Sequence, residues 1–193
     1  MDDDKIILTS DEEDSESFER ADIGSNIRIL PFTVHGEYYC MEITGAIEVV
    51  EAGLITIVPN VPAFVKGVMN LRGEIIAIID LGGIFGHPPK ELSAKSRIII
   101  TEMPAWGGKN QPLGEWESSN KHRDLVGLVV DEINDILDVN KTSIRSLIAT
   151  IKGKAAEYTT GQIKHADIMY ACLDIKKVLG SEDIRRLMTA DEN

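Results

Sequence analysis

The chain has little cysteine, few aromatic residues and no long apolar run. Two cysteines occur in 193 residues, and aromatic residues make up 5%. Cys40 and Cys172 both lie in short apolar segments, which is typical of buried small side chains in a reducing compartment and not of a disulfide framework. No segment approaches the roughly 20 apolar residues of a membrane helix, and no signal-peptide pattern opens the chain. We therefore expect a cytoplasmic protein that does not insert into a membrane.

The usual sequence signatures of catalysis and cofactor binding are also absent. The glycines form neither a phosphate-binding loop nor a dinucleotide fingerprint, and no serine lies in a nucleophile elbow. The acidic segment Asp131–Asp138 lacks the central glycine and final glutamate of a calcium loop. The four histidines, at positions 35, 87, 122 and 165, have no metal-ligand spacing. We therefore predict no cofactor and no metal.

Positive charge is scarce, and the formal net charge is -12. The segment Met1–Asp22 contains ten acidic and two basic residues, so most of the excess lies at the N-terminus. Such a polar segment buries too little apolar surface to offset chain entropy, and we predict that residues 1–25 form a disordered or loosely attached tail. A chain of this charge is not expected to bind nucleic acid or an anionic membrane surface.

The chain does contain many short β-type apolar segments separated by turn residues. The predicted strands are Ile27–Val34, Tyr38–Ile43, Ile47–Val50, Ile55–Val58, Val65–Leu71, Glu74–Leu81, Arg97–Glu102, Leu125–Asp131, Glu132–Val139, Thr159–His165 and Ile168–Leu173. Their regular spacing predicts a mainly β architecture of barrel or sandwich type.

Helices are predicted to be few and short. Gly82–Pro89 reads as a loop or a single helical turn, and Lys141–Thr150 is ambiguous, with one helical turn possible. Ile175–Leu179 is predicted as a short helix, and Glu182–Ala190 as a terminal helix with Ser181 as its N-cap.

The most informative segment is Val61–Gly86, which reads as two apolar strands joined by a tight turn at Arg72-Gly73. Glycine adopts a positive φ without steric cost and so favours a reversal there. The turn would lift Asn70, Arg72 and Glu74 away from an apolar body. A turn arginine can make planar, paired contacts with a carboxylate or backbone of another protein. From the residues alone, a solvated surface side chain is the favoured interpretation.

Three acidic residues are compatible with a second class of function. Asp80, Asp131 and Asp135, with histidines nearby in the sequence, would suit a β-barrel enzyme or ligand-binding protein. Asp80 also follows an apolar strand directly, where an acid commonly caps the next turn.

An ordered series of short motifs spans most of the chain. These are Ile47-Glu48-Val49, Pro59-Asn60-Val61-Pro62, KGVMNLRG over 66–73, Ile79-Asp80-Leu81, VGLVVD over 126–131, Thr160-Gly161 and Leu173-Asp174-Ile175. In this order and spacing, from about Ile27 to Leu179, the sequence resembles the CheW family, the coupling proteins of bacterial chemosensory arrays.

The resemblance implies a fold of two adjoining five-stranded SH3-like β-barrels with a few short helices and a C-terminal helix. The CheW-like domain would span 26–180, with an insertion at 103–123, and 181–193 would form the terminal helix and tail. The implied function is that of a non-enzymatic adaptor, monomeric in isolation, between chemoreceptor cytoplasmic tips and the regulatory domain of a CheA-type histidine kinase. It would be cytoplasmic and recruited to receptor arrays. Surface-motility and second-messenger pathways also use this family and remain alternatives.

The resemblance also implies a set of partner-binding residues. Asn70, Arg72, Gly73 and Glu48 match the family's interaction surface, and four apolar or small residues fall near the receptor groove between the barrels: Ala46, Val49, Gly67 and Met69. The chain departs from the family pattern where Gly82-Gly83 replaces an arginine after Leu81, where Ala77 replaces a proline, and in the long insertion with Trp106 and Trp116.

Overall fold

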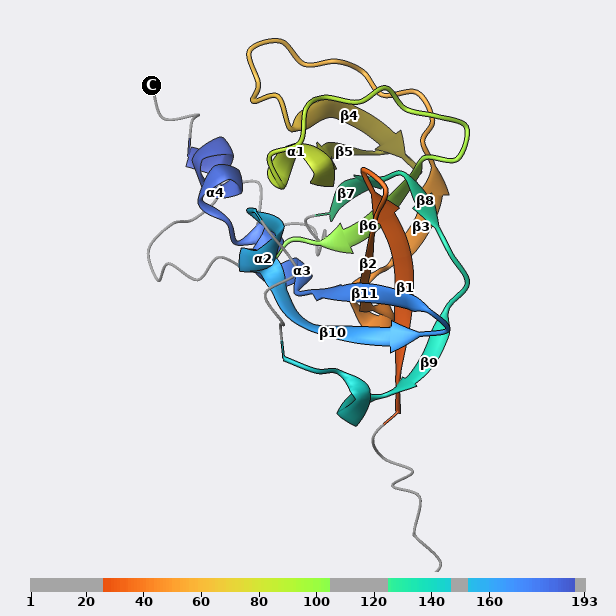
Figure 1. Cartoon of the computed structure of the whole chain (residues 1–193). Coiled ribbons are helices and arrows are strands. Elements are labelled where there is room, and N and C mark those ends of the chain that lie inside the picture. Colours follow the sequence, from red (N-terminus) through yellow and green to blue (C-terminus); the bar gives the residue numbers. More distant parts are fainter. Residues whose placement is uncertain (1–25, 105–124, 147–152, 190–193) are drawn as a thin grey trace, which may run out of the picture.

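A computed structural model describes residues 26–104, 125–146 and 153–189, which form two β-sheets joined by short helices (Figure 1). Sheet A contains β1 (Asn26–Val34), β2 (Glu37–Glu42), β8 (Glu132–Ile133), β9 (Leu137–Asn140), β10 (Thr159–His165) and β11 (Ile168–Leu173). Sheet B contains β3 (Glu48–Glu51), β4 (Val65–Leu71), β5 (Glu74–Asp80), β6 (Arg97–Glu102) and β7 (Leu125–Val130). The helical segments are η1 (Ile43–Gly45), α1 (Leu81–Ile84), η3 (Lys141–Ser143), α2 (Ala155–Tyr158), α3 (Ile175–Leu179) and α4 (Glu182–Thr189).

Sheet A combines the first and last strands of the described chain, whereas sheet B is built from its middle. The order in sheet A is β10-β11-β2-β1-β8, with β9 also paired to β1, and the order in sheet B is β3-β6-β7-β5-β4. Each sheet contains one parallel pair, β11 with β2 and β5 with β7, and the other pairs are antiparallel. The fold is therefore the predicted mainly β pair of adjoining small SH3-like barrels.

Each sheet has its own apolar cluster, and a third, larger cluster lies between the sheets. Ile29, Val139 and Ile163 are buried in the cluster of sheet A, and Ile76 and Ile98 in that of sheet B. The central cluster joins Phe32 of β1 to Leu128 of β7, and both side chains are fully buried. Because burial of this kind is the main stabilising term in folding, the central cluster should hold the two barrels as one unit.

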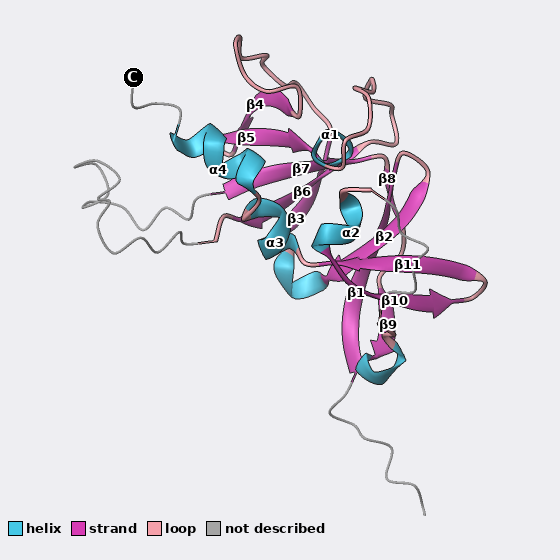
Figure 2. Ribbon diagram, turned by 60° about the vertical axis from the view of Figure 1, so that its left-hand side comes forward, coloured by secondary structure: helices cyan, strands magenta, loops and turns pink. Residues whose placement is uncertain are grey.

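Helices α1, α2 and α3 lie at the junction between the sheets (Figure 2). Tyr158 of α2, Val178 and Leu179 of α3, and Ile184 of α4 all belong to the central cluster. The backbone N–H of Lys177 donates to the Asp174 side chain, which caps α3. The C-terminal helices thus complete the core that the strands leave open.

Most predicted elements are confirmed. Both strands of the 65–71 and 74–80 hairpin are present, and the segments 97–102 and 125–130 pair as the expected antiparallel partners. The last two strands also pair as predicted, and α3 has the predicted bounds. Cys40 and Cys172 are buried free thiols, as expected.

The predicted strand Ile55–Val58 is wrong. Only Thr56 pairs, in an isolated bridge with Val68, and Leu54 and Ile57 are 95% and 82% exposed. Ile55 packs against the cluster of sheet B, but the segment makes no further strand pairing, and Pro59 cannot extend it because proline has no backbone donor.

Three other boundaries differ for local reasons. Leu81 begins α1 instead of ending β5, because the Asp80 carboxylate caps the helix. The predicted strand Glu132–Val139 is interrupted, and its two parts, β8 and β9, both pair with β1. This interruption gives sheet A six strands in the described chain where five were expected. The Lys141–Thr150 turn is the 3-10 segment η3 over its first three residues.

Ser181 departs from its predicted role as an N-cap. Its carbonyl accepts from the Arg185 backbone N–H, as an N-cap carbonyl does, but among the described residues its buried hydroxyl has no hydrogen-bond partner. The first turn of α4 carries Glu182 and Asp183 instead, which favour a helix N-terminus electrostatically.

Four predictions lie partly or wholly outside the described residues. They are the N-terminal tail at 1–25, most of the insertion at 103–123 with Trp106 and Trp116, the second part of 141–150, and the end of the terminal segment 181–193. Within the part of the chain that is described, no helix has the length and apolarity needed to cross a membrane.

Candidate protein-binding surface

The β4–β5 hairpin closes on a two-residue turn whose backbone is left-handed at both positions. Arg72 has φ +54° and Gly73 has φ +96°, as in the type I′ turns that match the twist of paired strands. The Asn70 side-chain carbonyl accepts from the Gly73 backbone N–H at 2.9 Å. A left-handed conformation is unfavourable for a residue with a side chain, so the hairpin holds Arg72 in a fixed but costly position.

The Arg72 side chain projects from this turn and forms an ion pair. Its Nη2 donates to Glu48 Oε2 at 2.7 Å, and the two side chains are 79% and 23% exposed. An exposed pair of this kind contributes at most about 1 kcal/mol to stability. Most of the guanidinium surface therefore remains available to another protein.

This ion pair joins the two edges of sheet B. Glu48 lies on β3 at one end of the strand order, and Arg72 follows β4 at the other end. Mutual hydrogen bonds of 2.8 and 2.9 Å between Thr56 and Val68 connect the same two sides of the sheet. The sheet thus curves until its edges meet, and this curvature brings Arg72 and Glu48 together although 24 positions separate them.

The four groove residues predicted from the resemblance do not share one environment. Val49 is exposed on β3, together with the neighbouring Ile47, and Ala46 packs against the central cluster. Gly67 and Met69 are both buried, and the Met69 side chain lies in the apolar cluster of sheet B.

Gly67 is required by its surroundings. A Cβ atom added there would lie 2.1 Å from the Thr56 carbonyl oxygen, and its φ is +137°. Its place in the fold is therefore to let two backbones approach closely at a bulge in β4. Any part that Gly67 and Met69 take in binding must be indirect, through the shape of the surface above them.

The departure at Gly82-Gly83 has a packing reason. An added Cβ would lie 2.6 Å from the His35 ring at Gly82 and 2.8 Å from Phe64 Cβ at Gly83. A larger residue in either position would have to displace the β1–β2 turn or the segment before β4. Small residues here allow the α1 end of sheet B to rest against sheet A.

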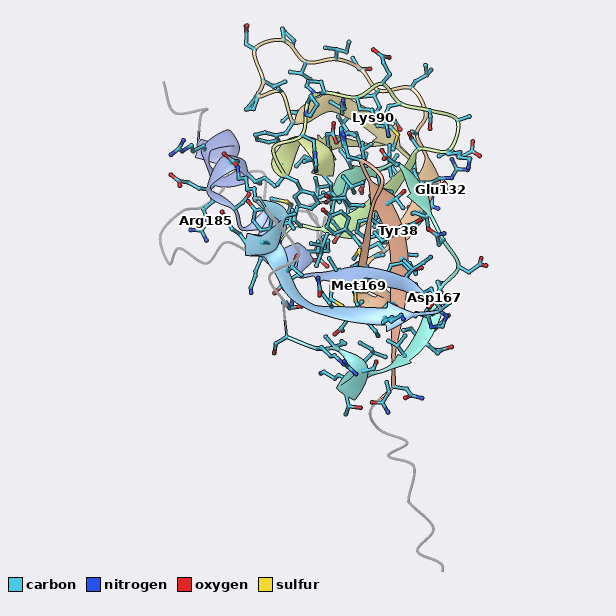
Figure 3. All side chains as sticks on the ribbon, viewed as in Figure 1. Tyr38, Lys90, Glu132, Asp167, Met169 and Arg185 are labelled. Carbon is cyan, nitrogen blue, oxygen red and sulfur yellow. The ribbon has the colours of Figure 1, made fainter. Side chains whose placement is uncertain are left out.

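The acidic residues of the alternative function are occupied in structural contacts. Asp80 caps α1 through the Gly82 N–H at 2.9 Å, as predicted, and lies 3.1 Å from Lys66 Nζ. Asp131 pairs with Lys90 at 2.8 Å. Lys90 and Glu132, next to Asp131, lie in the same upper part of the molecule (Figure 3).

Nothing in the described chain gathers these acids into one site. Asp135 is exposed on the segment between β8 and β9, and no group of three or more histidine, cysteine or acidic side chains is placed to hold a metal ion among the described residues. Within the described residues, Asp80, Asp131 and Asp135 therefore do not form the shared site that this alternative requires.

Two contacts were not predicted from the sequence. The rings of His35 and His87 stack with centroids 4.4 Å apart and connect the β1–β2 turn to the segment after α1. The Cys40 and Cys172 sulfur atoms lie 3.4 Å apart across β2 and β11. Both contacts join residues that are far apart in the chain. The sequence indicated only that these residues lie in or near β-strands, and not that they would meet.

Comparison with known proteins identifies the family. The family model described as the CheW-like domain matches residues 28–183. The chemotaxis protein CheW of Klebsiella aerogenes is 30% identical over 155 residues, covering 80% of this chain and 82% of that protein. The chemotaxis protein CheW of Treponema pallidum is 28% identical over 160 residues, covering 83% of this chain and 86% of that protein.

A solved structure agrees with the sequence comparisons. The crystal structure of the scaffolding protein TtCheW from Thermoanaerobacter tengcongensis superposes with a TM-score of 0.63 at 28% identity, covering 81% of this chain and 94% of that one. The two barrels, the motif order and these matches define one class of protein. The chain belongs to the CheW family of chemotaxis coupling proteins.

Proposed function

We propose that this protein is a non-enzymatic adaptor that couples chemoreceptor cytoplasmic tips to the regulatory domain of a CheA-type histidine kinase. The observation that carries the proposal is the family match over residues 28–183, which includes nearly all of both barrels. In this proposal the protein acts in the cytoplasm and is recruited to membrane-associated receptor arrays.

The geometry of sheet B supports a partner surface around the β4–β5 turn. Arg72 is largely exposed and is held at a turn whose backbone conformation is costly for a non-glycine residue. A stretch of exposed apolar side chains, Ile47 and Val49, lies next to Glu48 on β3. A charged anchor beside exposed apolar residues is the usual composition of a protein interface.

The adaptor acts by position. The central cluster makes the two barrels one body, so a partner bound to one barrel keeps a fixed relation to a partner bound to the other. Each interface alone needs only modest affinity, because many linked copies in an array raise the effective concentration.

The experiment that tests this function measures bridging and not only binding. A receptor tip fragment is immobilised, and the isolated regulatory domain of the cognate kinase is applied with and without the full adaptor chain. We expect the kinase domain to be retained only when the adaptor is present, in amounts that saturate with adaptor concentration.

Two results would contradict the proposal. If the receptor fragment retained the kinase domain without the adaptor, the adaptor would not be needed for coupling. Failure of a folded adaptor to bind either the receptor fragment or the kinase domain would leave only the fold in common with the family. Circular dichroism of the adaptor before and after the assay controls for unfolding.

A further inference from the structure

The two cysteines of the chain face each other across neighbouring strands of sheet A. Cys40 on β2 and Cys172 on β11 are direct register partners in a parallel pair. Neighbouring strands lie about 4.8 Å apart, within the range of Cα separations that disulfides span. Their sulfur atoms are 3.4 Å apart, with the Cys40 thiol donating to the Cys172 sulfur. Both cysteines are free thiols, and their sulfur atoms already lie within hydrogen-bonding distance of each other.

The pair lines a cavity that is partly open to solvent. A cavity of about 380 Å³ is lined by both cysteines, by apolar side chains such as Ile29 and Ile144, and by charged residues at its edge, among them Glu42 and Lys176. Its volume is in the range of small-molecule sites. We expect a small neutral reagent in this cavity to reach the Cys172 sulfur, which is 8% exposed, but not that of fully buried Cys40.

The two thiols are not equivalent. Cys40 is fully buried, and Cys172 is 8% exposed. The hydrogen bond from Cys40 lowers the pKa of the Cys172 thiol, whereas the same bond and burial raise the pKa of Cys40. Because the thiolate is the reactive form, Cys172 is the expected first nucleophile and Cys40 the resolving thiol.

We propose that Cys40 and Cys172 form an oxidisable dithiol that small organic disulfides convert, through this cavity, into an intramolecular disulfide. The Cys172 thiolate attacks one sulfur of the reagent, the reagent S–S bond breaks, and one reagent thiol leaves after taking up a proton. Cys40 then loses its proton and attacks the Cys172 sulfur, which releases the second reagent thiol. The protein dithiol loses two electrons, and the reagent disulfide gains them.

The test uses the full chain, reduced and then treated under native conditions with bis(2-hydroxyethyl) disulfide, which is small and uncharged. We expect intact mass to fall by two hydrogens, the protein to remain monomeric, and both thiols to become unreactive to a thiol reagent after denaturation. Little mixed disulfide should accumulate, because closure follows at once.

Two variants test the order of the steps. Cys40→Ser should stop at the mixed disulfide, with the mass of one reagent half added. Cys172→Ser should remain unmodified in the same time, because Cys40 is fully buried. In urea the protein is unfolded and both thiols are exposed to solvent, so the two variants should react at similar rates.

The proposal is overturned if native wild-type protein keeps both thiols, accumulates a mixed disulfide without closing, or links two copies of the chain. It is also overturned if native Cys172→Ser reacts as fast as Cys40→Ser. Circular dichroism confirms that each variant is folded, and the wild-type result alone decides the proposal if a variant is not.

Discussion

The two barrels contain the same kind of hairpin turn and use it differently. The β1–β2 turn of sheet A is His35-Gly36, with φ +50° and +79°, and the β4–β5 turn of sheet B is Arg72-Gly73, with φ +54° and +96°. His35 is half-buried and stacks on His87 from the other barrel. Arg72 is largely exposed and contacts only Glu48 among the ion pairs of the described chain.

The two turns differ in the residues that surround them and not in their backbone conformation. The His35 ring rests on Gly82, where an added Cβ would lie 2.6 Å away, so the sheet A turn is a contact between barrels. The sheet B turn faces solvent and is available to a partner. One local conformation therefore serves packing in one barrel and, in the proposed function, recognition in the other.

The largest effect is expected where a left-handed glycine is also crowded. Gly67→Ala should lower the free energy of unfolding by about 2–4 kcal/mol, because it adds backbone strain to an overlap with the Thr56 carbonyl. Gly36→Ala is the control, since it has φ +79° but open space around it, and should cost about 1 kcal/mol. Urea unfolding of both variants measures the difference. Equal losses would mean that close approach at Gly67 contributes nothing.

A smaller effect separates the two turn residues themselves. His35→Ala removes the ring stack between the barrels and should lower the free energy of unfolding by about 1 kcal/mol. Arg72→Ala removes an exposed ion pair and should change it by no more than about 0.5 kcal/mol. Thermal and urea unfolding of the two variants, each compared with wild type, provide the test. A larger loss for Arg72→Ala would make the Arg72–Glu48 contact structural.

The sequence predicted the individual strands and turns well, because apolar runs such as 97–102 and the Arg72-Gly73 reversal are local signals. It failed at Ile55–Val58, where Thr56 alone pairs and Ile57 stays 82% exposed although Ile55 packs against the cluster of sheet B. The pairings between strands that are far apart in the sequence could not be derived from the local pattern. The Arg72–Glu48 ion pair depends on the curvature of sheet B, and the contact between Cys40 and Cys172 depends on a parallel pairing of strands 132 positions apart.

Another small effect concerns Lys154, next to α2, which donates to Asp183 on α4. This hydrogen bond raises the pKa of Lys154 above its ordinary value of 10.5, against a lowering by burial. The contribution of the pair is therefore fully present below pH 10.5 and is lost as the pH rises through the raised folded-state pKa. Because both groups are partly exposed, Asp183→Asn should cost less than about 1 kcal/mol at neutral pH.

Unfolding free energies of wild type and Asp183→Asn between pH 7 and about pH 11 test this, with Glu182→Gln as the control. Glu182 is in the same helical turn but pairs with Arg186, which stays charged over this range. The difference in unfolding free energy between wild type and Asp183→Asn should decrease toward pH 11. The corresponding difference for Glu182→Gln should stay constant. A gap that widens with pH would reverse the assigned sign.

The central claim is that the exposed turn of sheet B takes part in partner binding. The most direct measurement is the Kd of the kinase regulatory domain, and separately of a receptor tip fragment, for wild type, Arg72→Glu and Arg28→Glu. Arg28 is the matched control, because it is an exposed arginine on β1 of sheet A paired with Asp138 at 3.7 Å.

We predict that Arg72→Glu weakens at least one of the two interactions by tenfold or more, an effect of about 1.4 kcal/mol, while the variant stays folded and Arg28→Glu leaves both within about twofold. Unchanged affinity of folded Arg72→Glu for both partners, or equal losses in the two variants, would contradict the account.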